Sequence, residues 1–265
     1  MIEIEKMINF NELKLASKNW ENAKPFPHII IDNFFENEIA IKLEKEFPNY
    51  NDKVWDNYNN AIEVKRICNN WKAFPSLTYQ VFSYLNSEKF VNKFSNIILN
   101  TSELISDPGL HGGGWHIHSR GGKLNTHLDY SLHPKLKLQR KINLIIFLNS
   151  KWEHNWGGRL GFWDNTSNKL PGELCKEIEP RFNKAVIFDT TKNSWHGLPE
   201  PINCPDNQYR KSIALYYLIT PSKNTDHRGK ALFSPTKSQS GDDKVLELIK
   251  KRSEVISASS VYEKK

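Results

Sequence analysis

Hydrophobic positions in the first part of the chain follow the spacing of amphipathic helices. One helical stripe consists of Phe34, Phe35, Ile39, Ile41, Leu43 and Phe47. The apolar run at 28–31 before it predicts a short strand, and further helices are predicted at 76–84 and 88–99. The polar stretch 49–60 between them is typical of a loop. The first hundred residues are therefore predicted to be mainly helical.

From about residue 110 onward, short apolar runs alternate with glycine-rich turns. These runs are 115–119, 141–147, 159–163, 185–188 and 210–219. Short strands separated by turn signals favour a β-sandwich or barrel over alternating βαβ units. We therefore predict a mainly β fold with helical support.

The pattern divides the chain into three predicted parts. Residues 1–109 would form helical support packed on the barrel, and residues 110–221 the β core. The segment 222–265 is polar and rich in lysine and serine, with one helix expected near 243–256.

Composition supports a folded protein without a membrane span. Of the 265 residues, 38% are hydrophobic and 12% aromatic, which excludes a fully disordered or fibrous chain. A mean hydropathy of -0.62 and the lack of a long apolar run argue against a spanning helix and a membrane partner. The N-terminus lacks a signal-peptide pattern, so a cytoplasmic location is expected. The isolated Cys68, Cys175 and Cys204 are expected to be free thiols.

The net charge of +7 favours an anionic partner or substrate. The basic residues are spread along the chain without a dense run, so nucleic-acid binding is disfavoured. An aromatic-rich segment, 152–163, includes His154 and Trp156 and would suit base stacking. Barrel core with a tight turn at Trp156-Gly157-Gly158 explains this segment better.

The strongest candidate for a metal site combines His127, Asp129 and His196. On a strand, residues two apart point to the same face, so His127 and Asp129 can approach one ion, and His196 from another strand can complete a triangle. Two imidazoles and one carboxylate leave coordination positions open, as a non-haem Fe(II) oxygenase requires. His-x-Asp alone is common by chance, so its weight depends on the residues that accompany it.

Arg210, which follows His196 in the sequence, is a candidate for binding a carboxylate. Strand alternation places Arg210 and Ser212 on one face, together with Ala214 and Tyr216. The planar guanidinium with a nearby hydroxyl is suited to holding a carboxylate. The continuous apolar and aromatic residues that follow indicate a buried strand.

Several ordered motifs then make the sequence recognisable. They are GGGWHIHSRGGKLNTHLDYS, RKINLIIFLNSKWEHNWGGRLGFWD, IEPRFNKAVIFDT and SWHGLPEPINCPDNQYRKSIALYYLIT, with PFPHIIIDNFFENEIAIKLEKEF before them. Together they cover most of residues 25–220. This stretch resembles the Fe(II)- and 2-oxoglutarate-dependent dioxygenases, in their prolyl-4-hydroxylase-like branch.

The resemblance implies a double-stranded β-helix, a jelly-roll or cupin-like fold, with N-terminal helices. It implies that His127, Asp129 and His196 bind Fe(II), and that Arg210, helped by Ser212, binds the distal carboxylate of 2-oxoglutarate. The implied reaction converts 2-oxoglutarate and O2 to succinate and CO2 while an unactivated C–H bond is hydroxylated, with ascorbate as a candidate reductant. The branch favours a prolyl residue or a proline-like substrate.

The sequence departs from this branch at one cosubstrate contact. Relatives often carry Tyr before Leu-Asn in the strand after His-x-Asp, whereas this chain has Phe147-Leu148-Asn149. Asn143 lies on the same predicted strand face as Phe147 and could replace the missing contact.

The carboxylate of Asp129 argues against a halogenase, in which a small residue typically replaces the acidic ligand.

Other arrangements give alternative hypotheses. His111, His116 and His118 resemble a cupin-type metal site but lack a carboxylate partner. Alternatively, His116 or His118 contacts 2-oxoglutarate or substrate.

The expected substrate is a small molecule, a peptide or a protein, and a sugar-linked compound is the alternative to proline. Rival classes are a non-catalytic cupin-like binding module and an oxygenase acting on nucleic acid. The sequence does not predict an oligomeric state.

Overall fold

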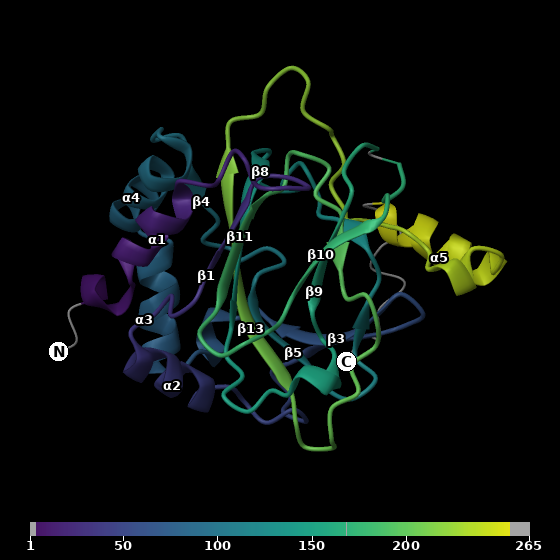
Figure 1. The fold of residues 1–265 in the computed structure, drawn as a ribbon, viewed down its shortest axis with the longest axis horizontal. Coiled ribbons are helices and arrows are strands. Elements are labelled where there is room, and N and C mark those ends of the chain that lie inside the picture. Colours follow the sequence, from purple (N-terminus) through teal and green to yellow (C-terminus); the bar gives the residue numbers. More distant parts are fainter. Residues whose placement is uncertain (1–3, 168, 255–265) are drawn as a thin grey trace.

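Two antiparallel sheets face each other in the computed structural model, which describes residues 4–167 and 169–254 (Figure 1). The larger sheet has the strand order β1-β11-β8-β13-β5-β3-β2, with β4 paired to β13 and β6 to β3. The smaller sheet has the order β10-β9-β12-β7-β14. The strands are β1 (His28–Ile31), β2 (Asp56–Asn59), β3 (Glu63–Cys68), β4 (Ile105–Ser106), β5 (Gly114–His118), β6 (Lys123–Leu124), β7 (His127–Leu128), β8 (Gln139–Phe147), β9 (Leu160–Trp163), β10 (Leu174–Ile178), β11 (Ala185–Asp189), β12 (His196–Gly197), β13 (Arg210–Ile219) and β14 (Leu232–Phe233).

Strand β13 shows how the larger sheet separates the core from the site. Ile213, Leu215 and Tyr217 lie in the main hydrophobic core. Arg210 and Ser212, at alternate positions, line a cavity on the opposite face. This alternation follows from the two-residue period of a strand, and the same split occurs in the neighbouring β8 and β5.

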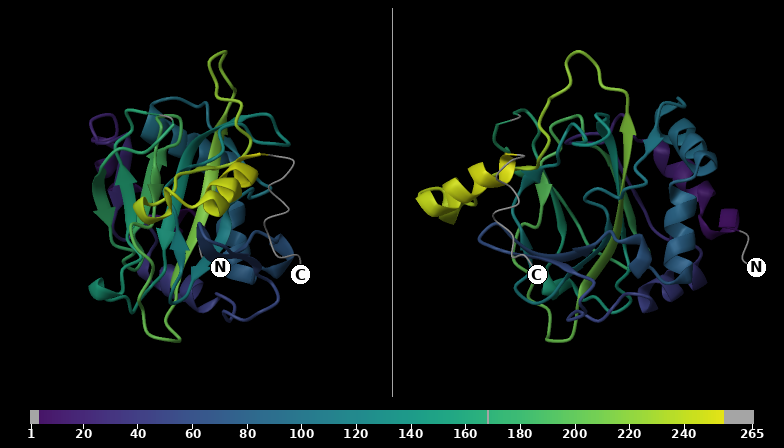
Figure 2. Two further views of the ribbon diagram at one scale, coloured as in Figure 1. Left: turned by 90° about the vertical axis from the view of Figure 1, so that its right-hand side faces the viewer. Right: turned by 180° about the vertical axis from the view of Figure 1, so that it is seen from behind.

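The N-terminal helices cover the outer face of the larger sheet (Figure 2). Helix α4 shows why they form: Ser87 caps its N-terminus, and Phe90, Phe94 and Ile98 recur at helical spacing and are buried. Asn100 ends the helix in the left-handed conformation, with a φ of 54°. The helices are α1 (Phe10–Ser17), α2 (Asn37–Lys45), α3 (Ser76–Leu85), α4 (Glu88–Leu99) and α5 (Asp243–Ser253).

The fold class predicted from the sequence is confirmed, but the first hundred residues are less helical than expected. Strand β1 pairs with β11 and β3 pairs with β5, so this part of the chain widens the larger sheet. The stretch 49–60, predicted to be a loop, contains β2. Strand β3 was not expected, because three of its six residues are charged: Glu63, Lys65 and Arg66. Strand β10 was also missed.

The C-terminal extension joins the smaller sheet. Strand β14 pairs with β7, and α5 packs beside it through Val245 and Ile249. The predicted helix at 243–256 is described as far as Ser253, and its last two positions lie outside the described residues. Strands from all three predicted parts pair within the two sheets. The division into three parts stays a prediction. No helix in the described part of the chain is long and apolar enough to cross a membrane.

Candidate active site

His127 and His196 are partners in the ladder between β7 and β12. The Nδ1 atom of His127 lies 2.9 Å from the carbonyl oxygen of Asn125, and Nδ1 of His196 lies 2.8 Å from that of Ser194. A carbonyl oxygen can only accept, so each imidazole donates its Nδ1–H. Each Nε2 therefore carries a lone pair that is available to a metal.

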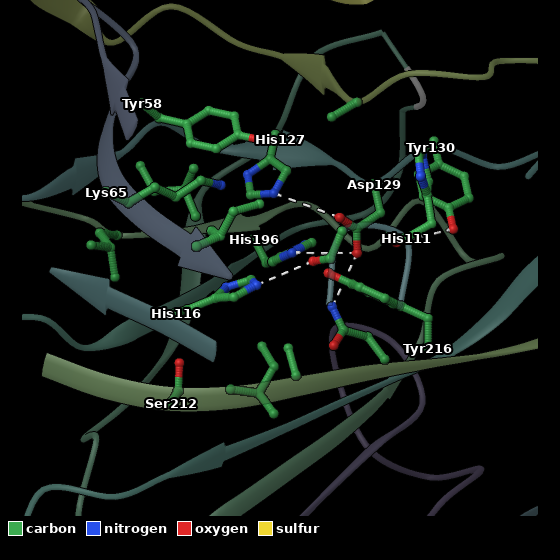
Figure 3. A pocket seen from close by; sticks show the side chains of 18 of the residues that line it. Tyr58, Lys65, His111, His116, His127, Asp129, Tyr130, His196, Ser212 and Tyr216 are labelled. Atoms are coloured by element: carbon green, nitrogen blue, oxygen red, sulfur yellow. Dashed lines mark hydrogen bonds and ion pairs between the residues drawn. The ribbon is translucent and has the colours of Figure 1, made fainter. Parts of the chain in front are cut away.

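Asp129 closes the triangle with these two rings (Figure 3). Its Oδ1 lies 3.8 Å from Nε2 of His127, and its Oδ2 lies 3.8 Å from Nε2 of His196. The three ligand atoms all lie within 4.8 Å of one another. In the described part of the chain, this is the only group of three or more histidine, cysteine or acidic side chains with such spacing. The triad His111, His116 and His118 does not form one.

The protonation states suit a divalent cation. Burial lowers the pKa of both His127 and His196, which keeps the rings neutral. Burial alone would raise the pKa of Asp129, but the charge of Arg140 and the hydrogen bond from Asn143 outweigh it and hold this pKa well below its usual range. Two neutral imidazoles and one carboxylate are the donor set of non-haem Fe(II) sites, so these residues fit iron.

Arg140 holds the carboxylate in place. Its Nη1 lies 3.2 Å from Oδ1 of Asp129, and its Nη2 donates to the carbonyl oxygen of His111 at 3.0 Å. The guanidinium lies between the rings of Tyr130 and Tyr216, 3.3 Å from each centroid. This arrangement was not predicted from the sequence, because an arginine at the start of a strand usually lies at the surface.

Arg210 is a buried cation that lines the same cavity as the candidate metal ligands. Its side chain is buried, Nε donates to the carbonyl oxygen of Gly158 at 2.7 Å, and the cation lies 4.7 Å from the ring centroid of Phe147. Burial lowers its pKa to about 9, and none of the described residues forms a salt bridge with it. A buried cation without a carboxylate favours binding an anionic ligand. Ser212 lies two residues further along the same cavity face.

A cavity of about 250 Å3 connects the two ends. The three candidate metal ligands line it, together with Arg210 and Ser212. Asn143 also lines it, but its Nδ2 donates to Oδ2 of Asp129 at 3.0 Å; its predicted contact with 2-oxoglutarate stays a prediction. The remaining lining residues include Asp56, Tyr58, Lys65, His111, His116, His118, Tyr130, Arg140, Ile145, Leu160, Tyr216, Lys230, Phe233 and Arg252.

Comparison with known proteins agrees with this geometry. Residues 113–218 match the model of the 2OG-Fe(II) oxygenase superfamily. Over 211 residues, the chain is 23% identical to prolyl 3-hydroxylase OGFOD1 of Xenopus laevis, covering 78% of this chain and 38% of that protein. Over 78 residues it is 30% identical to the mouse protein of the same name, covering 29% of this chain and 14% of the relative. The chain thus spans well under half of these relatives.

Solved structures share the fold. A prolyl hydroxylase of Trichoplax adhaerens, in complex with a hypoxia-inducible-factor peptide fragment, has a TM-score of 0.54 at 17% identity and covers 79% of this chain and 92% of its own. A prolyl 4-hydroxylase of Phytophthora capsici has a TM-score of 0.55 at 16% identity, covering 91% and 73%. The jelly-roll architecture expected from the sequence is confirmed by these similarities.

Proposed function

We propose that this chain, whose residues 113–218 form a 2OG-Fe(II) oxygenase domain, hydroxylates an unactivated C–H bond of a prolyl residue or proline-like substrate. The reaction would consume one 2-oxoglutarate and one O2 for each hydroxyl group formed, release succinate and CO2, and use Fe(II) as a cofactor that is not consumed. The observation that carries the proposal is the convergence of two Nε2 lone pairs and one carboxylate in the cavity that also contains Arg210.

The residues of this chain have separate tasks in the proposed reaction. His127, Asp129 and His196 hold iron from one side, which leaves the cavity side to the cosubstrate and O2. When bound, the iron supplies the redox chemistry, and the protein supplies orientation. Arg210 and Ser212 hold the distal carboxylate of 2-oxoglutarate and thereby direct its other end toward the iron.

The surroundings of Asp129 keep the metal site in one arrangement. Arg140 and Asn143 each contact a different oxygen of the carboxylate, so its rotation is restricted before iron arrives. The apolar side chains of Ile145 and Leu160 line the same cavity and reduce the access of water to the reacting atoms.

The substrate assignment rests on the relatives. Two of them are named prolyl 3-hydroxylases, and a prolyl hydroxylase with the same fold was solved with a peptide. These names support a proline within a peptide or protein as the first substrate to test. A cytoplasmic location and the use of ascorbate remain predictions of the sequence.

The test is hydroxylation of defined substrates by the purified full chain with Fe(II) and 2-oxoglutarate. Proline-containing peptides, free proline and proline-free control peptides should be compared by mass spectrometry and succinate release. The proposal predicts the gain of one oxygen atom on proline, matched by succinate, and its loss in His127→Ala. Succinate release with hydroxylation of a different compound would retain the chemistry and overturn the substrate.

A further inference from the structure

His118 is a buried side chain without a hydrogen-bond partner in the cavity that Arg210 also lines. Its exposed fraction is 2%, and neither Nδ1 nor Nε2 contacts a donor or acceptor. It lines the cavity that contains the metal triad. A buried polar group without a partner is costly, so its retention in a cavity wall points to a ligand.

The strand register places His118 beside Arg210. The two residues are direct partners in the ladder between β5 and β13. Opposite residues in an antiparallel pair have Cβ atoms roughly 5 Å apart when they share a face. Both side chains line the cavity, so one carboxylate can contact both.

A second cation lies on the other side of His118. Arg66 of β3 pairs with Ile117, which places Lys65 next to His118 across the sheet. Lys65 lines the cavity too, although its Nζ lies 3.3 Å from Oε2 of Glu63. Burial and the charges of Arg210 and Lys65 lower the pKa of His118 well below its usual value. The ring is therefore neutral and has one N–H to donate.

On the β8 side, the side chain that contacts the Arg210 cation is an apolar ring without a donor. Ser212 pairs with Phe147 of β8, whose ring lies under the Arg210 cation and has no hydroxyl. The polar contact that a tyrosine would supply at this position is therefore missing from β8. The available donor on the neighbouring strand is His118, on β5.

We propose that the imidazole N–H of His118 donates to the distal carboxylate of 2-oxoglutarate and shares this carboxylate with Arg210. His118 thereby takes the place of the hydroxyl that Phe147 lacks. The inference rests on the proposed function, because it requires that 2-oxoglutarate binds at Arg210.

The test is calorimetric titration of 2-oxoglutarate into the full chain loaded with Mn(II), which supports binding without turnover. In His118→Phe both ring nitrogens are lost, and we expect the Kd to rise about 10- to 100-fold, as for a hydrogen bond to a charged group. His118→Asn and His118→Gln place an amide near the positions of Nδ1 and Nε2, respectively, and one of them should restore most of the affinity. The exposed His154, replaced by alanine, is the control and should leave the Kd unchanged.

A second probe separates a direct contact from a change in fold. 2-Oxobutanoate keeps the keto acid but lacks the distal carboxylate, so its affinity should be the same in wild type and His118→Phe. An equal loss for both compounds would show that the substitution acts through the fold, and would overturn the proposal. An unchanged Kd for 2-oxoglutarate in His118→Phe would also overturn it.

The outcomes distinguish this inference from the proposed function. If wild type binds no 2-oxoglutarate, the proposed function fails. If wild type binds it and His118→Phe binds it equally well, only the inference fails. If His118→Phe does not fold, imidazole N–H resonances of wild type give the answer. When 2-oxoglutarate is added to the wild type, a slowly exchanging imidazole N–H signal should appear that the His118→Asn variant does not show. If no such signal appears in the wild type, the proposal is contradicted.

Discussion

His127 and His196 face each other across two short antiparallel strands, and each donates its Nδ1–H to the carbonyl oxygen two residues before it in the chain. The same local hydrogen bond thus fixes the tautomer of both rings. In this orientation, each Nε2 atom lies 3.8 Å from an oxygen of Asp129. In the proposed metal site, backbone carbonyl groups next to β7 and β12 therefore orient both imidazoles, and the rings of Phe233 and Phe188 pack against them.

Replacement of one ligand should remove the metal while the fold persists. Loss of a residue that only supports a metal ligand typically lowers the metal affinity by roughly 10- to 100-fold. We expect His127→Ala, which removes a ligand itself, to lower the affinity for Mn(II) or Fe(II) by more than this. The thermal midpoint without metal should change little, because this ring serves the open site. Isothermal titration and thermal denaturation measure both, with His154→Ala as control. Metal affinity equal to wild type in His127→Ala would contradict the assignment.

Replacement of Arg140 should affect both stability and metal binding. Arg140→Met keeps much of the side-chain length but leaves the buried Asp129 without its cation, which typically costs about 3–5 kcal/mol. We expect a loss of this order in the free energy of unfolding of the metal-free protein, together with weaker metal binding. Urea denaturation tests this.

Arg159→Met is the control variant for Arg140→Met. Arg159 pairs with Glu177 and Glu200, side chains that are 40% and 58% exposed, and contacts the exposed His154, so its loss should cost about 0–1 kcal/mol. Equal losses in the two variants would show that the contact between Arg140 and Asp129 has no special role.

Replacement of Arg210 should separate cosubstrate binding from metal binding. Arg210→Met removes a buried charge-assisted contact, for which losses of about 2–5 kcal/mol are typical, so the Kd for 2-oxoglutarate should rise by at least about 30-fold. The Mn(II) affinity should stay within about twofold of wild type, because Arg210 contacts none of the proposed ligands. Titration of each ligand in turn checks this. A loss of Mn(II) affinity as large as the loss for 2-oxoglutarate would refute the division of tasks.

Stability should fall in acid because buried histidines resist protonation. Burial, with the charges of Arg140 and Lys65 respectively, lowers the pKa of His111 to about 4 and that of His116 to about 3, from 6.5. Between these values and pH 6.5, the unfolded chain binds more protons than the folded chain. The free energy of unfolding should therefore decrease as the pH falls, by up to ~1.4 kcal/mol per pH unit for each histidine.

Urea denaturation of the metal-free protein at pH 7, 6 and 5 measures this dependence. The variant with both His111→Asn and His116→Asn should show a shallower slope than wild type, because two of the groups responsible are gone. Identical slopes would mean that these two side chains do not resist protonation in the folded state.

Strand periodicity predicts that His127 and Asp129 share one face, and the motifs that accompany them in the sequence support adding His196 to the proposed metal triad. The position of Arg210 could also be predicted, because the apolar residues that follow it indicate a buried strand. The position of Lys65 could not be predicted, because a strand with several charged residues resembles an exposed segment. Of the charged residues of its strand, β3, Lys65 lines the cavity, Glu63 pairs with Lys65 and Arg252, and Arg66 lies over the ring of Tyr50.

Long-range contacts could not be predicted. The position of Arg140 between Tyr130 and Tyr216 depends on the meeting of three separate segments. The pairing of β14 with β7, which places the ring of Phe233 against His127, likewise depends on the path of the C-terminal extension. Neither leaves a periodic signal in the sequence.

The central claim is tested most directly by succinate formation from 2-oxoglutarate in wild type and His127→Ala, with Fe(II), O2 and a panel of proline-containing substrates. The account predicts Fe(II)-dependent succinate in wild type, increased by a substrate, and none above background in His127→Ala. If the wild-type protein binds Fe(II) and 2-oxoglutarate yet forms no succinate with any substrate, the account of an oxygenase is contradicted. Equal succinate from both proteins would contradict the metal site.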